Sequence, residues 1–93
     1  MQKLTEEEIR QAAGQLPAWM LENGELVQQR TFQDFVAAMA FVNDVAQLAE
    51  AAGHHPDIDI RYNRVRLALV THDAGGLTSK DINLAQKINN LGH

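Results

Sequence analysis

The sequence predicts an α+β domain in which a four-stranded antiparallel sheet is covered on one face by three helices, in the order α-β-β-α-β-β-α. Three observations lead to this fold class. Two separate stretches begin with a helix-capping sequence, two pairs of alternating stretches flank turn residues, and a long stretch of helical periodicity lies between the two pairs. Because the chain has 93 residues, we expect one domain over residues 1–93, small enough that burial against a second copy would add stability.

The first helix is expected over residues 5–15. Thr5 and Glu8 have the spacing of a capping box, in which the hydroxyl accepts from a first-turn amide and the carboxylate reaches back to the cap. Pro17 lacks an amide donor and disfavours helical backbone at the residue before it, so the helix should finish ahead of it.

A hairpin is expected next. Residues 19–22 and 25–30 flank the pair Asn23-Gly24, which tolerates the positive φ angles of a tight two-residue turn. These two segments are the first two strands of the predicted sheet.

A long amphipathic helix should begin at Gln33 or Asp34 and run to about Ala52. Its apolar residues recur at helical spacing and form one stripe, made by Phe35, Met39, Val42, Ala46 and Ala49. Val36, Ala40 and Val45 widen this stripe. Gly53 can adopt the left-handed backbone that closes helices. Glu50 therefore lies in the last turn of this helix.

The second hairpin and the last helix complete the fold. Residues 58–62 and 65–69 alternate apolar and polar residues around a turn near Asn63, so their apolar side chains should share one face. The second of these strands should end at Val70 or Thr71, followed by a flexible loop over residues 73–76. The last helix should begin at a second capping box, formed by Thr78 and Asp81. It should bury a stripe of apolar residues, Ile82, Ala85 and Ile88.

Composition excludes several classes of protein. The formal net charge of -4 lacks the basic excess on which direct nucleic-acid binding draws. Without cysteine the chain can form neither a disulfide framework nor a thiolate zinc site. No apolar run approaches the roughly 20 residues of a membrane span, and the first ten residues lack the apolar core of a secretory signal. We expect a cytoplasmic protein with no membrane contact and no direct nucleic-acid partner.

The most informative segment runs from Glu50 to Asp81. It reads Glu, three residues, His54-His55-Pro56, five residues, Tyr, nine residues, His72, eight residues, Asp. Histidine has an unperturbed pKa of about 6.5 and exchanges protons near neutrality, so three histidines in one segment indicate acid-base chemistry. Neighbouring side chains diverge in an extended loop, so the adjacent pair should meet different parts of a substrate.

This spacing resembles the signature of the pterin-4a-carbinolamine dehydratase family, which is also called the 4a-hydroxytetrahydrobiopterin dehydratase family. The resemblance implies a hydro-lyase that removes water from a 4a-hydroxytetrahydropterin to give a quinonoid dihydropterin, as part of tetrahydropterin recycling. It implies no metal or redox cofactor, and a homodimer or homotetramer.

The resemblance also assigns the site residues. His54, His55 and His72 match the catalytic histidines, and the pterin contacts match two segments, Gly53, His54 and His55 in one and Val70, Thr71, His72 and Asp73 in the other. Pro56 would fix the loop, while Glu50 and Asp81 could orient imidazoles through hydrogen bonds. The resemblance does not say which histidine is the acid.

Each assignment has a plainer interpretation. Asp81 is explained as a helix cap, Glu50 as a solvated helix residue, and Tyr62 as a core or sheet aromatic, so Tyr62 is not placed among the catalytic residues. Three imidazoles can bind zinc, but adjacent histidines rarely point at one metal and the helical i, i+4 pair is absent, so no metal site is predicted.

A second class of function stays open. Members of the resembled family in animals also serve as dimerisation cofactors that bind a helical segment of a transcription factor. That role requires no catalysis, only a helix surface that the domain leaves free. The same amphipathic stripes are expected to pack on the sheet, which favours the enzyme.

Overall fold

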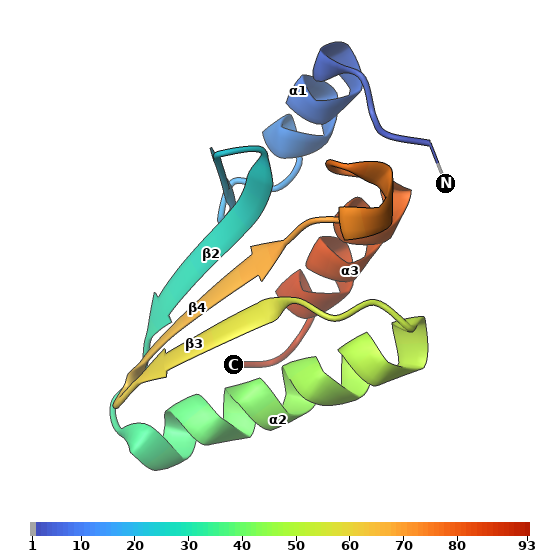
Figure 1. The fold of residues 1–93 in the computed structure, drawn as a ribbon. Helices are drawn as coiled ribbons and strands as arrows, with labels where there is room; N and C mark the ends of the chain where they lie inside the picture. The colour runs from blue at the N-terminus through green and yellow to red at the C-terminus, as the bar shows by residue number, and fades with distance from the viewer. Residues whose placement is uncertain (1) are drawn as a thin grey trace.

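The computed structural model describes residues 2–93 and confirms the predicted fold class. Its elements, in order, are α1 (Glu6–Gly14), β1 (Met20–Glu22), β2 (Glu25–Thr31), α2 (Phe35–Ala52), β3 (Asp57–Arg61), β4 (Arg64–Leu69), a 3-10 turn (His72–Ala74) and α3 (Ser79–Asn89). The strands pair antiparallel in the order β1-β2-β4-β3. Figure 1 shows α2 and α3 against the sheet and α1 beyond the end that carries the β1–β2 turn.

The helix ends lie where the capping residues predict. Thr5 forms a capping box at the start of α1, and Asp34 accepts a hydrogen bond from the Ala37 amide at the start of α2. Gly53 closes α2 with a left-handed φ of 63°. A capping box at Thr78 begins α3. Local hydrogen-bonding chemistry therefore sets all four of these boundaries.

Both hairpin turns use positive φ angles, but one of them corrects an expectation. Asn23 and Gly24 have φ of 51° and 80°, as the Asn-Gly pair predicts. In the second hairpin Tyr62 has a φ of 54° and its side chain is 65% exposed. The expectation that Tyr62 is a core or sheet aromatic was wrong, because Tyr62 occupies the turn itself rather than the apolar face of a strand.

The core lies between one face of the sheet and the two longer helices. Val65, Leu67 and Leu69 alternate on β4 and are fully buried, while Arg64 and Arg66 point to the other face. Helix α3 contributes Leu84, Ala85 and Ile88 to the same core, and Leu16 and Trp19 close it beside α1.

The stripe predicted for α2 was partly wrong. The buried residues of α2 are Ala38, Phe41, Val42, Val45 and Ala49, of which only Val42, Val45 and Ala49 were expected. Phe35 and Val36 are 48% and 75% exposed. Phe35, Val36, Ala40 and Ala46 of α2 are exposed within the described part of this chain. By length and composition, α2 is also the one helix within residues 2–93 long and apolar enough to cross a bilayer.

One corner of the core is polar. Gln28 on β2 is buried and accepts a hydrogen bond from Arg30 Nε at 2.9 Å. The Arg30 guanidinium lies 4.6 Å from the ring centroid of Phe41, a cation–π contact. Burial lowers the pKa of Arg30 from its ordinary value. Arg30 pairs with Val65 near the start of β4, so this corner lies at the opposite end of that strand from His72.

Candidate active site

The structure brings His54, His55 and His72 to one cleft of about 260 Å³. Three segments line it: residues 53–55 after α2, residues 70–73 after β4, and Lys80 in the first turn of α3. We call it the histidine cleft. All seven substrate-contacting residues predicted from the sequence lie on its wall.

His54 is held by a buried carboxylate. Its Nε2 lies 2.5 Å from Asp81 Oδ1, and the side chains are 11% and 0% exposed. A carboxylate only accepts hydrogen bonds, so Nε2 carries a proton and Nδ1 is left to act on other groups. Asp81 also accepts from the Thr78 amide at 2.9 Å. The capping role and the orienting role of Asp81 are thus both present.

Two buried threonines complete this hydrogen-bond network. Thr71 Oγ1 donates to Asp81 Oδ2 at 2.8 Å and lies 2.8 Å from Thr78 Oγ1. Because the Thr71 proton points at the carboxylate, Thr78 donates to Thr71 and accepts in turn from the Lys80 amide at 3.2 Å. Asp81 therefore receives three donors, which fixes its position beneath His54. The side chain of Thr71, predicted to touch substrate, is instead turned into the protein.

His55 has a different and more exposed partner. Its Nε2 lies 2.8 Å from Glu50 Oε1 in the last turn of α2, with side chains 63% and 79% exposed. The two neighbouring histidines thus bind different carboxylates, as their divergence in an extended loop predicts. Glu50 contacts an imidazole, which the solvated-residue interpretation did not require.

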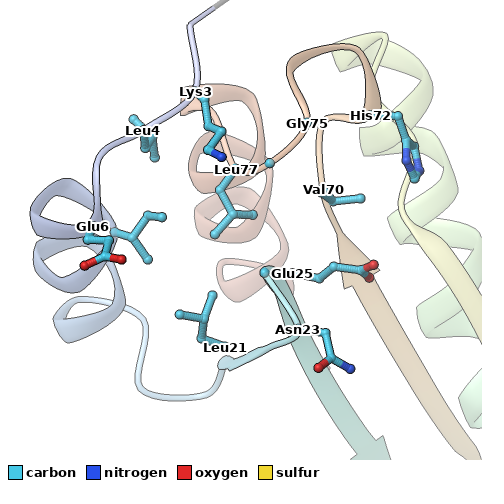
Figure 2. Close-up of a pocket in the computed structure, with 13 residues that line it drawn as sticks. Lys3, Leu4, Glu6, Leu21, Asn23, Glu25, Val70, His72, Gly75 and Leu77 are labelled. Atoms are coloured by element: carbon cyan, nitrogen blue, oxygen red, sulfur yellow. The ribbon is translucent and has the colours of Figure 1, made fainter.

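His72 follows β4 in a short 3-10 turn, which the segment predicted as a loop over residues 73–76 contains in part. Thr71 pairs with Gly76 as an isolated bridge, and residues 72–74 form a 3-10 turn closed by Gly75 at a φ of 74°. Gly75 permits this tight turn, because glycine adopts positive φ without steric cost. Figure 2 shows the His72 and Val70 side chains extending to the same side of the segment.

The remaining predicted residues support the cleft from its edges. Pro56 separates His55 from β3 through a trans peptide, and Gly53 ends α2 directly before His54. Sequence reasoning missed the roles of Thr71 as a buried donor and of Lys80 as a cleft residue. The capping box was a signal for the first, since it places Thr78 and Asp81 together. No signal in the sequence indicates the second. Within residues 2–93 no cluster of three His, Asp or Glu side chains is arranged to hold a metal ion.

Comparison with known proteins places this geometry in a family. Residues 2–91 match the family model described as pterin 4 alpha carbinolamine dehydratase. A protein of Acidobacterium capsulatum, provisionally named as a pterin-4-alpha-carbinolamine dehydratase, is 63% identical over 98% of this chain and 99% of its own. A protein of Chloroflexus aurantiacus with the same provisional name is 62% identical over 98% of each chain.

Solved structures agree with the fold. A crystal structure from Brucella melitensis, described as a transcriptional coactivator/pterin dehydratase, has a TM-score of 0.89 and 36% identity, covering 94% of this chain and 95% of its own. A pterin dehydratase-like protein described as a RuBisCO assembly factor in the alpha-carboxysome has a TM-score of 0.61 at 21% identity over 76% of this chain and 82% of its own, and shares the fold. With the family model matching nearly the whole chain and relatives above 60% identity, this chain belongs to the pterin 4 alpha carbinolamine dehydratase family.

Proposed function

We propose that this protein is a pterin-4a-carbinolamine dehydratase that removes water from a 4a-hydroxytetrahydropterin by histidine acid-base catalysis, in tetrahydropterin recycling. The observation that carries the proposal is the histidine cleft itself, in which three imidazoles line one hollow and one of them is backed by a fully buried carboxylate. Family membership supplies the substrate class.

The elimination requires two proton transfers. A general acid protonates the hydroxyl oxygen at C4a, and the C–O bond breaks with its electron pair leaving as water. A general base removes the proton from ring nitrogen N5, so that the C4a=N5 double bond forms and the quinonoid product results. Positioned groups accelerate each transfer by about 10²- to 10⁴-fold.

His54 is the group best placed to be the base. In its neutral form the proton on Nε2 is committed to Asp81, so Nδ1 carries the lone pair that accepts a proton. Once Nδ1 is protonated, the adjacent carboxylate of Asp81 stabilises the imidazolium. Asp81 is a positioning residue in this scheme, because it acts through His54.

The acid is then His55 or His72, the other two imidazoles of the histidine cleft. The pH dependence of turnover in single His→Ala variants distinguishes them. A fall in rate at alkaline pH reports loss of the acid's proton, so the variant that lacks the acid loses this fall, whereas the other variant keeps it.

The direct test is an absorbance assay of 4a-hydroxytetrahydropterin breakdown at neutral pH. We expect the protein to accelerate breakdown above the spontaneous rate, and an unchanged rate would contradict the proposal. A matched sample of the His54→Ala/His55→Ala variant, checked for native circular dichroism, controls for acceleration by groups outside the histidine cleft.

A homodimer or homotetramer is part of this proposal. Helix α2 exposes Phe35, Val36, Ala40 and Ala46 on its outer side in the single chain, and exposed apolar side chains gathered on one element favour an interaction site. A second copy is the simplest cover for side chains of this kind. The cytoplasmic location stays a prediction from the sequence.

The same exposed side chains favour a second candidate function, that of a non-catalytic cofactor that binds a helix of a partner protein. The description of the Brucella relative as a transcriptional coactivator/pterin dehydratase agrees with this alternative. The His54→Ala/His55→Ala variant separates the two. If it folds and keeps its biological effect while losing pterin turnover, partner binding is the function that matters.

A further inference from the structure

The face of the sheet opposite the helices carries a small hollow of about 240 Å³, here called the arginine hollow. Its wall comes from three adjacent strands and comprises Gln29 on β2, Arg64 and Arg66 on β4, and Asp59 and Arg61 on β3. On β4 the two arginines alternate with the buried Val65 and Leu67, so their side chains point away from the core. The polar face of the sheet therefore forms this hollow.

The arginine hollow is separate from the histidine cleft, with which it shares no residue. Arg61 ends β3 and Arg64 begins β4, whereas His72 follows the other end of β4. Figure 1 shows the turn between β3 and β4 at the far end of the sheet from the segment that follows β4. A function of this hollow therefore goes beyond the proposed dehydration and does not rest on it.

Positive charge is concentrated in the arginine hollow. Three of the eight lysine and arginine residues of the chain line it, and Asp59 is the one acidic residue of its wall within the described part of the chain. Three arginines and one aspartate give the wall a formal charge of +2, whereas the whole chain has a formal net charge of -4. A local potential of this sign attracts small anions.

Ion pairs neutralise only part of this charge. Arg61 Nε donates to Asp59 Oδ1 at 3.0 Å, and these side chains are 74% and 48% exposed. Arg66 Nη2 lies 3.7 Å from Glu22 Oε1, which is beyond hydrogen-bonding distance. Arg64 forms no ion pair with another residue within residues 2–93. The guanidinium of Arg64 is therefore available to a ligand, and that of Arg66 is only weakly engaged.

Strand register places two of the arginines in unfavourable positions. Arg61 lies directly opposite Arg64 across β3 and β4, and like charges at directly opposite positions destabilise a sheet. Asp59 lies directly opposite Arg66, yet its carboxylate accepts a hydrogen bond from Arg61 on its own strand. An anion bound between the arginines would offset the repulsion that this pairing leaves.

We propose that the arginine hollow binds a small anion through a phosphate group, with Arg64 and Arg66 as its main ligands and Arg61 and Gln29 as additional donors. A guanidinium presents its donors in a planar fork that matches two phosphate oxygens, and Gln29 can donate from its side-chain amide. A phosphate monoester carries about -1.5 to -2 charges at neutral pH, which complements the charge of the wall.

The size of the hollow limits the ligand. At about 240 Å³ it lies below the roughly 300–1,000 Å³ of most small-molecule sites, so it holds the phosphate group rather than the whole of a large ligand. Nucleic acid is less suitable, because its affinity depends on many lysine and arginine contacts along a row of phosphates. Glu22 and Asp57 on the neighbouring parts of β1 and β3, and the net negative charge of the chain, repel such a row.

The test is an NMR titration of the nitrogen-15-labelled protein with inorganic phosphate, methyl phosphate, acetate and a short single-stranded oligonucleotide, at one ionic strength maintained with sodium chloride. Arg64→Gln and Arg66→Gln, each checked for native circular dichroism, remove one proposed ligand at a time. Arg10→Gln is the matched control, because Arg10 is an exposed arginine of α1 outside the hollow and its loss changes the net charge equally.

We expect saturable shifts confined to β2, β3 and β4 with both phosphates, and no saturation with acetate. Arg64→Gln and Arg66→Gln should each weaken phosphate binding by about 10-fold, the loss expected for a hydrogen bond to a charged group, and Arg10→Gln should leave it unchanged. Equal binding of the two phosphates identifies the free ion as a sufficient ligand, and tighter binding of methyl phosphate identifies monoesters. Both results support the proposal.

The inference is overturned by shifts that stay linear in phosphate concentration, by equal weakening in Arg10→Gln, by acetate binding as tightly as phosphate, or by tighter binding of the oligonucleotide than of either phosphate. Denaturant unfolding gives a second readout. Phosphate stabilises many proteins by exclusion from their surfaces, so the informative quantity is the difference between variants. We expect phosphate to raise the unfolding midpoint more in Arg10→Gln than in Arg64→Gln, and equal rises would contradict a site at the arginine hollow.

Discussion

At the scale of single residues, Asp81 has both a structural role at the start of α3 and a contact with His54. One oxygen of its carboxylate receives the Thr78 amide and the Thr71 hydroxyl, and the other receives the His54 imidazole. A residue that caps α3 therefore also selects the protonated nitrogen of His54. Sequence reasoning presented these roles as alternatives, because a capping box explains an aspartate completely without showing that an imidazole from another segment lies over it.

The first prediction concerns Asp81→Asn. The oxygen of the introduced amide must face the two donors of Thr71 and Thr78, so the amide nitrogen must face His54 and donate to Nε2. The His54 proton is then forced to Nδ1, where the base is needed. We expect kcat to fall by about 10²-fold or more. Nitrogen-15 NMR of the imidazole should report the exchanged tautomer.

The matched control for that substitution is Asp57→Asn, an exposed aspartate of β3 outside the histidine cleft. It should change neither kcat nor the NMR signals of His54. If the Asp81→Asn variant kept both the tautomer and the turnover of the unmodified protein, the carboxylate would serve the helix alone.

The second prediction concerns Thr71, whose buried hydroxyl donates to Asp81 and accepts from Thr78. Thr71→Val keeps the shape but leaves both partners one hydrogen bond short, which costs about 1–3 kcal/mol of unfolding free energy. Thr71→Ser restores the hydroxyl and should recover most of it. Denaturant unfolding measures both, and equal stability of the Val and Ser variants would contradict the role of the hydroxyl.

At the scale of elements, local chemistry was predictable and the choice between packing faces was not. The helix ends were predictable because each has a capping residue whose side chain or backbone conformation closes the helix. These residues are Thr5, Asp34, Gly53 and Thr78. Helix α2 carries apolar residues on its exposed side as well as on its buried side. Periodicity identifies an apolar stripe but not which stripe meets the sheet, and the predicted stripe therefore included Phe35, which is exposed.

The predictions for the segments around Tyr62 and His72 differ from the structure for another reason. The apolar alternation includes Tyr62 and therefore predicts that the strand extends to it. In the structure, pairing of β3 with β4 ends at Arg61 and Arg64, so Tyr62 lies in the turn. Consecutive glycines after His72 predicted a loop without defined pairing, whereas Thr71 and Gly76 form a bridge. Backbone pairing decides both, and the apolar pattern and the glycine content of the sequence do not specify which residues pair.

The third prediction tests the left-handed end of α2. Gly53 has a φ of 63° and no neighbouring atom within 4 Å of an added Cβ, so Gly53→Ala costs only backbone strain, about 1–2 kcal/mol. Because Gly53 directly precedes His54, turnover should fall as well. Chemical denaturation and the dehydration assay measure the two effects.

Gly14 in α1 is the matched control, since its added Cβ also meets nothing within 4 Å and its φ is not positive. Gly14→Ala should be neutral or stabilising by up to about 1 kcal/mol. Equal costs at the two glycines would contradict a special requirement for left-handed backbone at the end of α2.

At the scale of the whole molecule, the site exists because three distant segments converge. The spacing of the histidines predicted residues that line the cleft, and a resemblance implies the chemistry that we propose for them. The buried path from Lys80 through Thr78 and Thr71 to Asp81 could not be predicted, because it depends on α3 packing beside the end of β4.

The fourth prediction concerns assembly. Val36 is 75% exposed on α2, and the proposed homo-oligomer buries this side of the helix. Val36→Lys places a charge there and should shift the sedimentation mass toward the single chain while the circular dichroism stays native. Gln86→Lys, on the exposed side of α3, should leave the mass unchanged. An unmodified protein that sediments as a single chain would contradict the proposed assembly.

The most direct test of the account is the rate of 4a-hydroxytetrahydropterin breakdown, followed by absorbance at neutral pH, for the unmodified protein and for folded His54→Ala, His55→Ala and His72→Ala variants. We predict acceleration above the spontaneous rate that each substitution reduces by about 10²-fold or more. Acceleration that survives all three substitutions, or no acceleration by the unmodified protein, would contradict catalysis by the histidine cleft.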